Sequence, residues 1–273
     1  MSQPDELAET AARYLRFEFA FADRPLEGRV VAVAGATGGL GAATAVLLAS
    51  KGCRLILGYR SSRDRAEALA GVITARAGTP PILIAGALED ADVRARYRQA
   101  AERLGGLDGL AIFAGRPARI PPQQLTRDAL VAALEPNFIG PVLLARELGE
   151  DMEARARPGS IVLLASMQAV APFSSSLAYG PAKAALAQAA RVLARQWRYV
   201  NVNVVAPGVT LAGMAQASVA AGKYDACLQQ GLLRRFGRAE DIARLVCFLL
   251  EPDHYITGQI IVADGGLTLR GTL

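Results

Sequence analysis

The sequence has very few of the residues that metal sites and disulfides require. Its 273 residues include one histidine, His254, and three cysteines, Cys53, Cys227 and Cys247, which are far apart and lie in apolar surroundings. A histidine-cluster metal site is therefore excluded, and a disulfide framework or a cysteine-based metal site is disfavoured. We expect no bound metal ion and a reducing compartment, the cytoplasm.

Charged and aromatic residues are also scarce. They make up 20% and 6% of the chain, whereas 52% of the residues are hydrophobic, which is typical of a compact globular enzyme. The formal net charge is +5, but the arginines are scattered along expected helices with acids between them. A solvated surface explains this distribution better than a nucleic-acid site, so we expect no nucleic-acid partner.

Long uninterrupted apolar runs are missing as well. The uncharged stretch 30–50 is long enough to span a bilayer, but Gly35, Gly38, Gly39 and Gly41 interrupt it and weaken any helix there. The N-terminus lacks the basic start and the apolar run of a signal peptide. We expect no membrane partner and no export.

Apolar segments of strand length alternate with segments of helix length. The expected strands are 30–34, 55–57, 82–85, 110–113, 161–164, 202–206 and 259–263, and the expected helices are 39–51, 63–77, 90–104, 127–155, 186–198 and 239–250. Parallel strands need helical crossovers, so this alternation predicts an α/β fold, a doubly wound parallel sheet with helices on both faces. In such folds ligands bind beyond the carboxyl ends of the strands.

The first 27 residues precede this pattern as a helical extension. They include four aromatic residues, Tyr14, Phe17, Phe19 and Phe21. Since apolar surface is costly to leave in water, we expect the extension to pack on the body or on a partner subunit. A membrane-surface helix is the alternative, and too few basic residues support it.

A glycine loop follows the first expected strand, in the order Gly-Ala-Thr-Gly-Gly-Leu-Gly from Gly35 to Gly41. Glycines let the backbone approach a phosphate closely, and the free amides of a following helix can bind it. A glycine loop alone is weak evidence, because a tight turn from strand to helix needs the same residues.

The second expected strand ends at Tyr59-Arg60-Ser61, with no acid to bind the ribose 2′-hydroxyl of NAD. The Arg60 guanidinium and the Ser61 hydroxyl suit a 2′-phosphate instead, which favours NADP(H) as the cofactor. The alternative is a solvated arginine that opens the next helix.

Tyr179 and Lys183 are four residues apart, hence one turn apart on one helix face. At about 5 Å and an effective dielectric constant of about 20, an ammonium favours a phenolate by roughly 3 kcal/mol. Pro181 fits only the first turn of a helix, so Tyr179 should lie at the helix start. Ser166 follows the expected strand 161–164 and precedes Tyr179 by 13 residues.

Together these features resemble the short-chain dehydrogenase/reductase family, over nearly all of the chain from 28 to 266. The resemblance also rests on Asn137 in Glu-Pro-Asn-Phe-Ile-Gly, on Pro207-Gly208, and on the segment 255–266. It implies one Rossmann-like domain over residues 28–273, and a nicotinamide-dependent oxidoreductase acting on CH–OH and C=O groups.

The resemblance implies a role for each matched residue. Tyr179 would protonate the carbonyl oxygen that Ser166 holds. Lys183 would bind the nicotinamide ribose and favour the tyrosine phenolate, and Asn137 would order a proton-relay water. The implied cofactor contacts are Gly35, Thr37, Gly39, Leu40, Gly41, Tyr59, Arg60, Ser61, Leu88, Ala114, Gly115, Tyr179, Lys183, Pro207, Gly208 and Val209.

Several residues depart from the family pattern, all in the cofactor half. They are Ala34 for a threonine, Ala87 for an aspartate that commonly touches the adenine, Ile112-Phe113 for two asparagines, and Ala212 for a threonine that often meets the carboxamide. These departures predict weaker cofactor binding with the reaction type retained.

Within the family, the end of the second strand and the segment 255–266 are most similar to 3-oxoacyl-carrier-protein reductases. The expected partner is thus a ketone, either a small molecule or one bound to a carrier protein, and the resemblance implies a homo-oligomer, a tetramer or a dimer. The alternatives are an enzyme acting on a free sugar, steroid or aromatic polyketide, or a dinucleotide-binding relative without turnover. Serine hydrolysis is disfavoured, because Ser166 lacks a nucleophile-elbow pattern and only His254 could serve as base.

Overall fold

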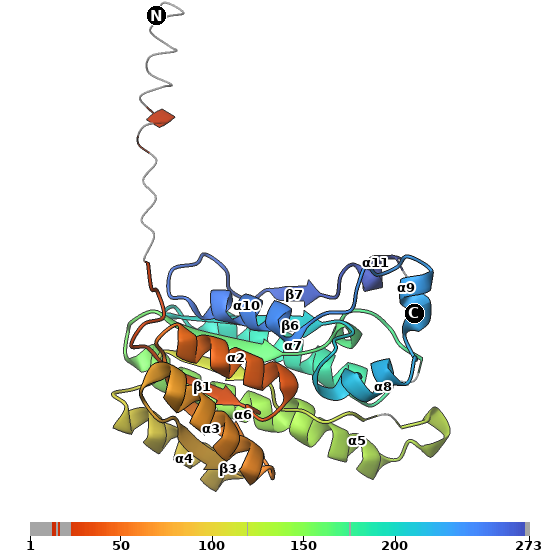
Figure 1. Cartoon of the computed structure of the whole chain (residues 1–273). Helices are drawn as coiled ribbons and strands as arrows, with labels where there is room; N and C mark the ends of the chain where they lie inside the picture. The colour runs from red at the N-terminus through yellow and green to blue at the C-terminus, as the bar shows by residue number, and fades with distance from the viewer. Residues whose placement is uncertain (1–12, 15, 17–22, 119, 175, 271–273) are drawn as a thin grey trace, which may run out of the picture.

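The domain is built around one parallel β-sheet (Figure 1). The computed structural model describes residues 13–14, 16, 23–118, 120–174 and 176–270, and within them a 7-stranded sheet has the order β3-β2-β1-β4-β5-β6-β7. The strands are β1 Val30–Ala34, β2 Arg54–Tyr59, β3 Ile82–Ala85, β4 Gly109–Ile112, β5 Gly159–Leu164, β6 Val200–Pro207 and β7 Ile260–Ala263. Every predicted strand is present, and no bound differs by more than two residues.

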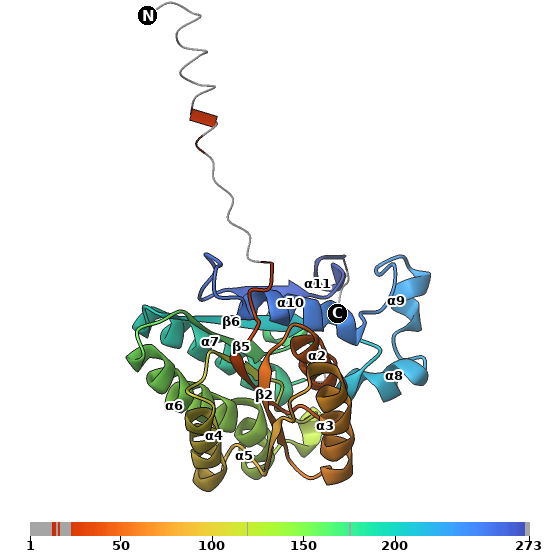
Figure 2. The ribbon, with the colours of Figure 1, turned by 60° about the vertical axis from the view of Figure 1, so that its left-hand side comes forward.

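Helices cover both faces of this sheet (Figures 1 and 2). They are α2 Gly39–Ser50, α3 Arg63–Ala77, α4 Ala91–Arg103, α5 Arg127–Leu134, α6 Gly140–Ala154, α7 Tyr179–Gln196, α8 Gln216–Ala220, α9 Asp225–Gln229, α10 Ala239–Leu250 and α11 Leu267–Arg270. Short helical turns are η1 Pro122–Gln124, the π-helix η2 Glu135–Ile139, η3 Met167–Ala169 and η4 Gly213–Ala215. The predicted doubly wound parallel sheet is confirmed.

The side chains of β1 alternate between two apolar clusters. Val30, Ala32 and Ala34 pack in the cluster that includes α4, α6 and α7. Val31 and Val33 pack in the cluster that includes α2 and α10. A strand buried on both faces needs an apolar residue at every position, which explains why the strands are continuous apolar runs in the sequence.

The junction between the N-terminal extension and the sheet is also buried. Leu26 lies in the cluster beneath α2 and α10, and its carbonyl oxygen accepts a hydrogen bond from the Cys53 thiol at 3.3 Å. The expected packing of the aromatic extension concerns mostly Phe17, Phe19 and Phe21, which lie outside the described residues, whereas Tyr14 is described and exposed.

The predicted helix 127–155 is divided. The π-helix η2 separates α5 from α6, and Pro136 lies within it. Proline has no N–H to donate to the helical ladder, so a helix that contains it departs from regular α geometry. The whole stretch, Arg127–Ala154, is long and apolar enough to cross a membrane by length and composition alone.

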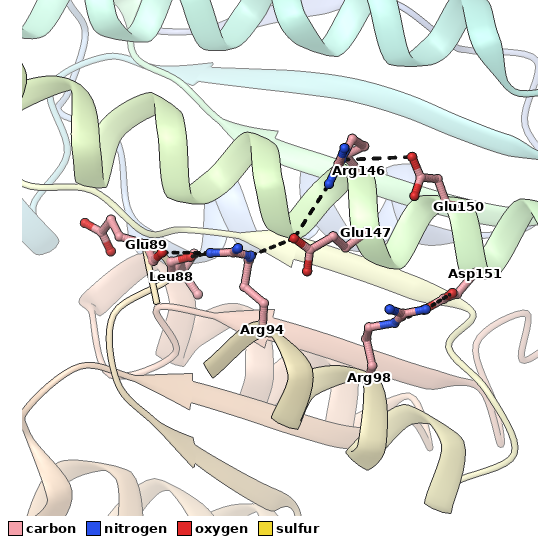
Figure 3. Close-up of polar contacts among 8 residues, drawn as sticks. All are labelled: Leu88, Glu89, Arg94, Arg98, Arg146, Glu147, Glu150 and Asp151. Atoms are coloured by element: carbon pink, nitrogen blue, oxygen red, sulfur yellow. Dashed lines mark hydrogen bonds and ion pairs between the residues drawn. The ribbon is translucent and has the colours of Figure 1, made fainter. Parts of the chain in front are cut away.

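Ion pairs tie α6 to α4 (Figure 3). Arg94 Nε lies 2.9 Å from Glu147 Oε1, and Arg98 binds both carboxylate oxygens of Asp151 at 2.7 Å. On its other side α6 places Leu144 in the core of the sheet. The helix therefore packs as part of the globular domain, with charges facing a neighbouring helix.

Candidate active site

The glycine loop lies where the strand order of the sheet reverses. β1 pairs with β2 on one side and with β4 on the other, and in doubly wound sheets ligands bind at such a point. Gly35 has φ +82°, and a Cβ added there would lie 2.9 Å from the Ala114 nitrogen. A Cβ at Gly41 would lie 2.4 Å from the Gly35 oxygen. The close contacts of this loop therefore exclude any side chain at either position.

Two cavities border the carboxyl ends of the strands. The larger one, about 470 Å³, is bounded by the segments after β5 and β6 and by residues 117–118 and 120–122. The smaller one, about 220 Å³, is bounded by the segments after β1, β2, β3 and β4. The glycine loop and the start of α2 lie between them, because Thr37 lines the smaller cavity and Leu40 the larger.

Ser166 follows β5 and caps the short helix η3. Its Oγ accepts a hydrogen bond from the Gln168 backbone nitrogen at 3.3 Å. That bond uses one oxygen lone pair and leaves the hydroxyl hydrogen for a second partner. Since Ser166 lines the larger cavity, this partner can be a ligand there.

Tyr179 is the first residue of α7 and lines the same cavity. The helix start is fixed by the Gly180 nitrogen, which donates to the Ser176 oxygen at 2.9 Å and to its Oγ at 3.0 Å. A Cβ at Gly180 would lie 3.1 Å from the Gln168 oxygen, so α7 packs closely on the segment that carries Ser166. The structure thus brings Ser166 and Tyr179 to one cavity, as predicted.

Lys183 lies one turn further along α7 and is 2% exposed. Its Nζ lies 5.9 Å from the centre of the Tyr179 ring and donates to the Leu164 oxygen at 2.9 Å and to the Ala114 oxygen at 3.4 Å. Burial lowers the pKa of Lys183 to about 7. The amine joins the ends of β4 and β5 to the helix that carries Tyr179.

Asn137 lies in the π-helix and is fully buried. Its Nδ2 donates to the Ala133 oxygen at 2.9 Å and to the Arg116 oxygen at 3.0 Å, and its Oδ1 accepts from the Arg116 nitrogen at 3.1 Å. A Cβ at Gly115 would lie 2.8 Å from Asn137 Oδ1 and 3.2 Å from Lys183 Nζ. Asn137 therefore holds the loop after β4 against Lys183, and only glycine fits between them.

The structure divides the predicted cofactor contacts between the two cavities. The smaller one is lined by Gly35, Thr37, Tyr59, Arg60, Leu88, Ala114 and Gly115, and the larger one by Leu40, Tyr179, Pro207, Gly208 and Val209. The remaining four, Gly39, Gly41, Ser61 and Lys183, line neither cavity. Gly39 packs instead against the segment before η4, since a Cβ there would lie 2.9 Å from the Gly213 nitrogen.

The residues that depart from the family pattern occupy distinct places. Ile112 is buried in the core, Phe113 and Ala87 line the smaller cavity, and Ala212 lines the larger one. Two cavity residues that the sequence analysis did not single out are Tyr97 in the smaller cavity and Gln168 in the larger one. Tyr97 lies on α4, and Gln168 lies on the short helix η3. Within a helix, spacing alone does not separate residues that line a cavity from residues of the core.

The chain is similar to known oxidoreductases over most of its length. A sequence model described as enoyl-(acyl carrier protein) reductase matches residues 35–268. The D-threitol dehydrogenase of Mycolicibacterium smegmatis is 30% identical over 264 residues, which cover 96% of this chain and 100% of that protein. The 3-oxoacyl-(acyl-carrier-protein) reductase of Bos taurus is 31% identical over 244 residues, 88% of this chain and 98% of that protein.

A solved structure supports the same assignment. The short-chain dehydrogenase/reductase from Serratia marcescens has a TM-score of 0.79 and 34% sequence identity, and the match covers 89% of this chain and 99% of that chain. The named relatives differ in substrate but agree in the class of reaction. The resemblance inferred from the sequence is confirmed: the chain belongs to the short-chain dehydrogenase/reductase family and is an NAD(P)-dependent oxidoreductase of alcohols or ketones.

Proposed function

We propose that this enzyme uses NADPH to reduce a ketone to a secondary alcohol, and that the ketone is a 3-oxoacyl thioester. The observation that carries the proposal is the placement of Ser166 and Tyr179 on one cavity, with the Lys183 amine buried next to Tyr179. A hydroxyl that holds the carbonyl oxygen and a phenol that protonates it are the two groups that such a reduction needs.

Each residue of the site has its own role in the proposed reaction. Ser166 donates a hydrogen bond to the carbonyl oxygen, and the Tyr179 hydroxyl transfers its proton to the same oxygen, which becomes the alcohol hydroxyl. The bound nicotinamide supplies the hydride that the carbonyl carbon accepts. When protonated, Lys183 favours the phenolate that remains. Asn137 Oδ1 keeps a second lone pair for a water that returns the proton.

The chain offers a built site for the dinucleotide. The glycine loop opens α2, whose first backbone amides suit a pyrophosphate. Arg60 lines the smaller cavity, is exposed, and makes no ion pair within the described part of the chain. A guanidinium can bind a 2′-phosphate through two hydrogen bonds, so Arg60 supports NADPH over NADH.

The larger cavity favours an acyl substrate over a free sugar. Its walls include Leu40, Ile120, Met167, Phe173 and Val209, which offer no hydrogen bonds to sugar hydroxyls. An alkyl chain gains about 25 cal/mol for each Å² of apolar surface that it buries here. The exposed ammonium of Lys223 also borders this cavity and suits an anionic group on a carrier.

A substrate panel tests the proposal. NADPH consumption is followed at about 340 nm with 3-oxoacyl thioesters of increasing chain length, simple ketones, keto sugars and cyclic ketones. We expect kcat/KM to rise with acyl chain length and to exceed the value for every free sugar. Faster turnover of a polyol or keto sugar would contradict the thioester assignment. Absence of turnover with every ketone, despite NADPH binding, would indicate a dinucleotide-binding relative without activity.

A further inference from the structure

Tyr97 is a buried phenol on the wall of the smaller cavity. It belongs to α4, is 1% exposed, and lines the space shared with Arg60 and Leu88. Burial raises the pKa of the Tyr97 hydroxyl, so the phenol stays neutral and can both donate and accept a hydrogen bond. Among the described residues this hydroxyl has no hydrogen-bond partner.

Gly58 makes room for this hydroxyl. A Cβ added to Gly58, near the end of β2, would lie 1.5 Å from Tyr97 Oη and 2.7 Å from its Cζ. Any larger residue at position 58 would displace the phenol. The Tyr97 hydroxyl therefore occupies the space that a side chain at position 58 of β2 would fill. This position directly precedes Tyr59 and Arg60, which also line the cavity.

The loop after β3, which also lines this cavity, is held firmly. Arg94 Nη1 donates to the Leu88 and Glu89 carbonyl oxygens, both at 2.8 Å, and its Nε binds Glu147 on α6 (Figure 3). A Cβ at Gly140 would lie 3.0 Å from the Glu89 nitrogen, so the start of α6 packs on the same loop. Contacts with α4 and α6 thus fix this part of the cavity wall.

The Tyr97 hydroxyl borders the cavity, so it can bond to a ligand that enters there. The cavity, about 220 Å³, has room for a flat heterocycle, and the exposed Arg60 that lines it suits a phosphate. At Ala87 the cavity lacks the carboxylate that could otherwise bond to such a ring.

We propose that the Tyr97 hydroxyl binds the polar edge of the adenine base of the dinucleotide. The proposal rests on the dinucleotide site of the proposed function and assigns a residue to its base. Adenine offers an exocyclic amine that donates and ring nitrogens that accept, and a neutral phenol can pair with either. Tyr97 thereby supplies the contact that Ala87 cannot make.

Direct binding to Tyr97→Phe tests this assignment without turnover. The probes are NADPH, adenosine 2′,5′-bisphosphate, which carries the base without nicotinamide, and reduced nicotinamide mononucleotide, which lacks the base. Loss of one neutral hydrogen bond should raise the Kd of the first two probes by about 2- to 13-fold and leave the third unchanged. The matched control, Tyr199→Phe, removes a hydroxyl from a half-exposed ring that lines neither cavity and should change no Kd.

Thermal stability without ligand separates recognition from structure. Phenylalanine keeps the ring in place, so Tyr97→Phe should melt at the same temperature as the wild type or higher. Unchanged Kd values for NADPH and the bisphosphate would overturn the assignment. A lower melting temperature together with an equal rise in the Kd of all three probes would overturn it as well. If the wild type bound neither NADPH nor the bisphosphate, the dinucleotide site itself would be wrong. Binding of both without ketone turnover would instead contradict only the proposed reaction.

Discussion

Lys183 is a basic residue whose burial disfavours its charged form. Burial lowers the pKa of its amine to about 7, whereas the unfolded chain keeps the ordinary value of 10.5. Between these values the unfolded state holds a proton that the folded state lacks. Folding stability should therefore rise with pH through this window, and the group should contribute no pH dependence below about pH 6, where both states hold the proton.

The comparison with Lys183→Met isolates this effect. We expect the free energy of unfolding of the wild type to rise relative to that of the variant as the pH is raised from about 7 to about 9. The rise should be at most about 1.4 kcal/mol per pH unit. Urea denaturation at matched pH values measures the difference, in which the titration of groups that do not interact with Lys183 cancels. A difference that stayed constant with pH would mean that the amine keeps its charge when folded.

Tyr179 can be tested by removing only its transferable proton. Tyr179→Phe should lower kcat by about 10²- to 10⁴-fold, the usual contribution of a general acid, with little change in the Kd for NADPH. Tyr224→Phe is the matched control, because Tyr224 lines the same cavity and should retain most of the activity. Survival of more than about 10% of kcat in Tyr179→Phe would require another acid.

The positions of site residues were predictable from the sequence only where a pattern carried chemistry. Ser166, Tyr179 and Lys183 combine a strand end, a helix start and a one-turn spacing, and the structure places them together. Tyr97 gave no such signal, because it follows Val93 by four residues on α4, as an ordinary core residue of a helix would. Only the space left by Gly58 distinguishes it.

At the scale of elements, we expect the end of β2 to select the cofactor. Tyr59 and Arg60 both border the smaller cavity, and Arg60 is exposed. The wild type should have a higher kcat/KM with NADPH than with NADH, and Tyr59→Asp should reverse this order, because a carboxylate repels the 2′-phosphate and accepts from a 2′-hydroxyl.

A nearby arginine provides the control for that preference. Arg63→Ala removes a cation that already binds Glu67 at 2.7 Å and does not line the cavity, so the preference for NADPH should persist. Equal kcat/KM values with both cofactors in the wild type would show that the end of β2 does not select the cofactor.

Ile112 and Phe113, at the end of β4, depart from the family pattern together but lie in different environments. Ile112 lies in the apolar core, whereas Phe113 borders the smaller cavity. Phe113→Asn should tighten NADPH binding by about 2- to 13-fold if the amide regains one hydrogen bond. Ile112→Asn should lower the free energy of unfolding by about 1–3 kcal/mol, since it buries an amide among apolar side chains.

Fluorescence titration and urea denaturation measure the two effects separately. Tighter binding in Ile112→Asn without loss of stability would mean that β4 can accept the asparagine pair of the family. Unchanged binding in Phe113→Asn would mean that this wall is rebuilt and that the predicted weakening of cofactor binding is wrong.

Element positions were more predictable than element boundaries. Strands buried on both faces are continuous apolar runs, so all of the strands were found. Apolar periodicity alone indicated only 186–198 of α7, because its first turns contain Gly180 and alanines. The position of Pro181 predicted a start at Tyr179, and the structure confirms that start. The π-helix was not predicted, and the side-chain bonds of Asn137 within it reach Arg116, a distant contact that no local pattern contains.

At the scale of the whole molecule, one edge of the sheet bears exposed apolar side chains. β7 is an edge strand, and it lies with α10 and α11 at one side of the molecule (Figures 1 and 2). The exposed residues there are Phe248, Tyr255, Val262 and Leu269, of which Leu269 is 89% exposed. Exposed apolar groups near a sheet edge are typical of an interface, and symmetric self-association is the commonest way to cover them.

We therefore expect the wild type to form a homo-oligomer through this edge. Val262→Glu with Leu269→Glu places charges where a second copy of β7 would pack, and burying an unpaired carboxylate is strongly unfavourable. Light scattering after size exclusion should give a multiple of the 28.7 kDa chain mass for the wild type and a smaller species for the double variant. Val72→Glu on α3, an exposed valine away from β7, is the control and should leave the mass unchanged. A monomeric wild type would contradict the interface. An oligomer that persisted in the double variant would move the interface to other exposed apolar side chains, such as Leu130 and Val131 on α5.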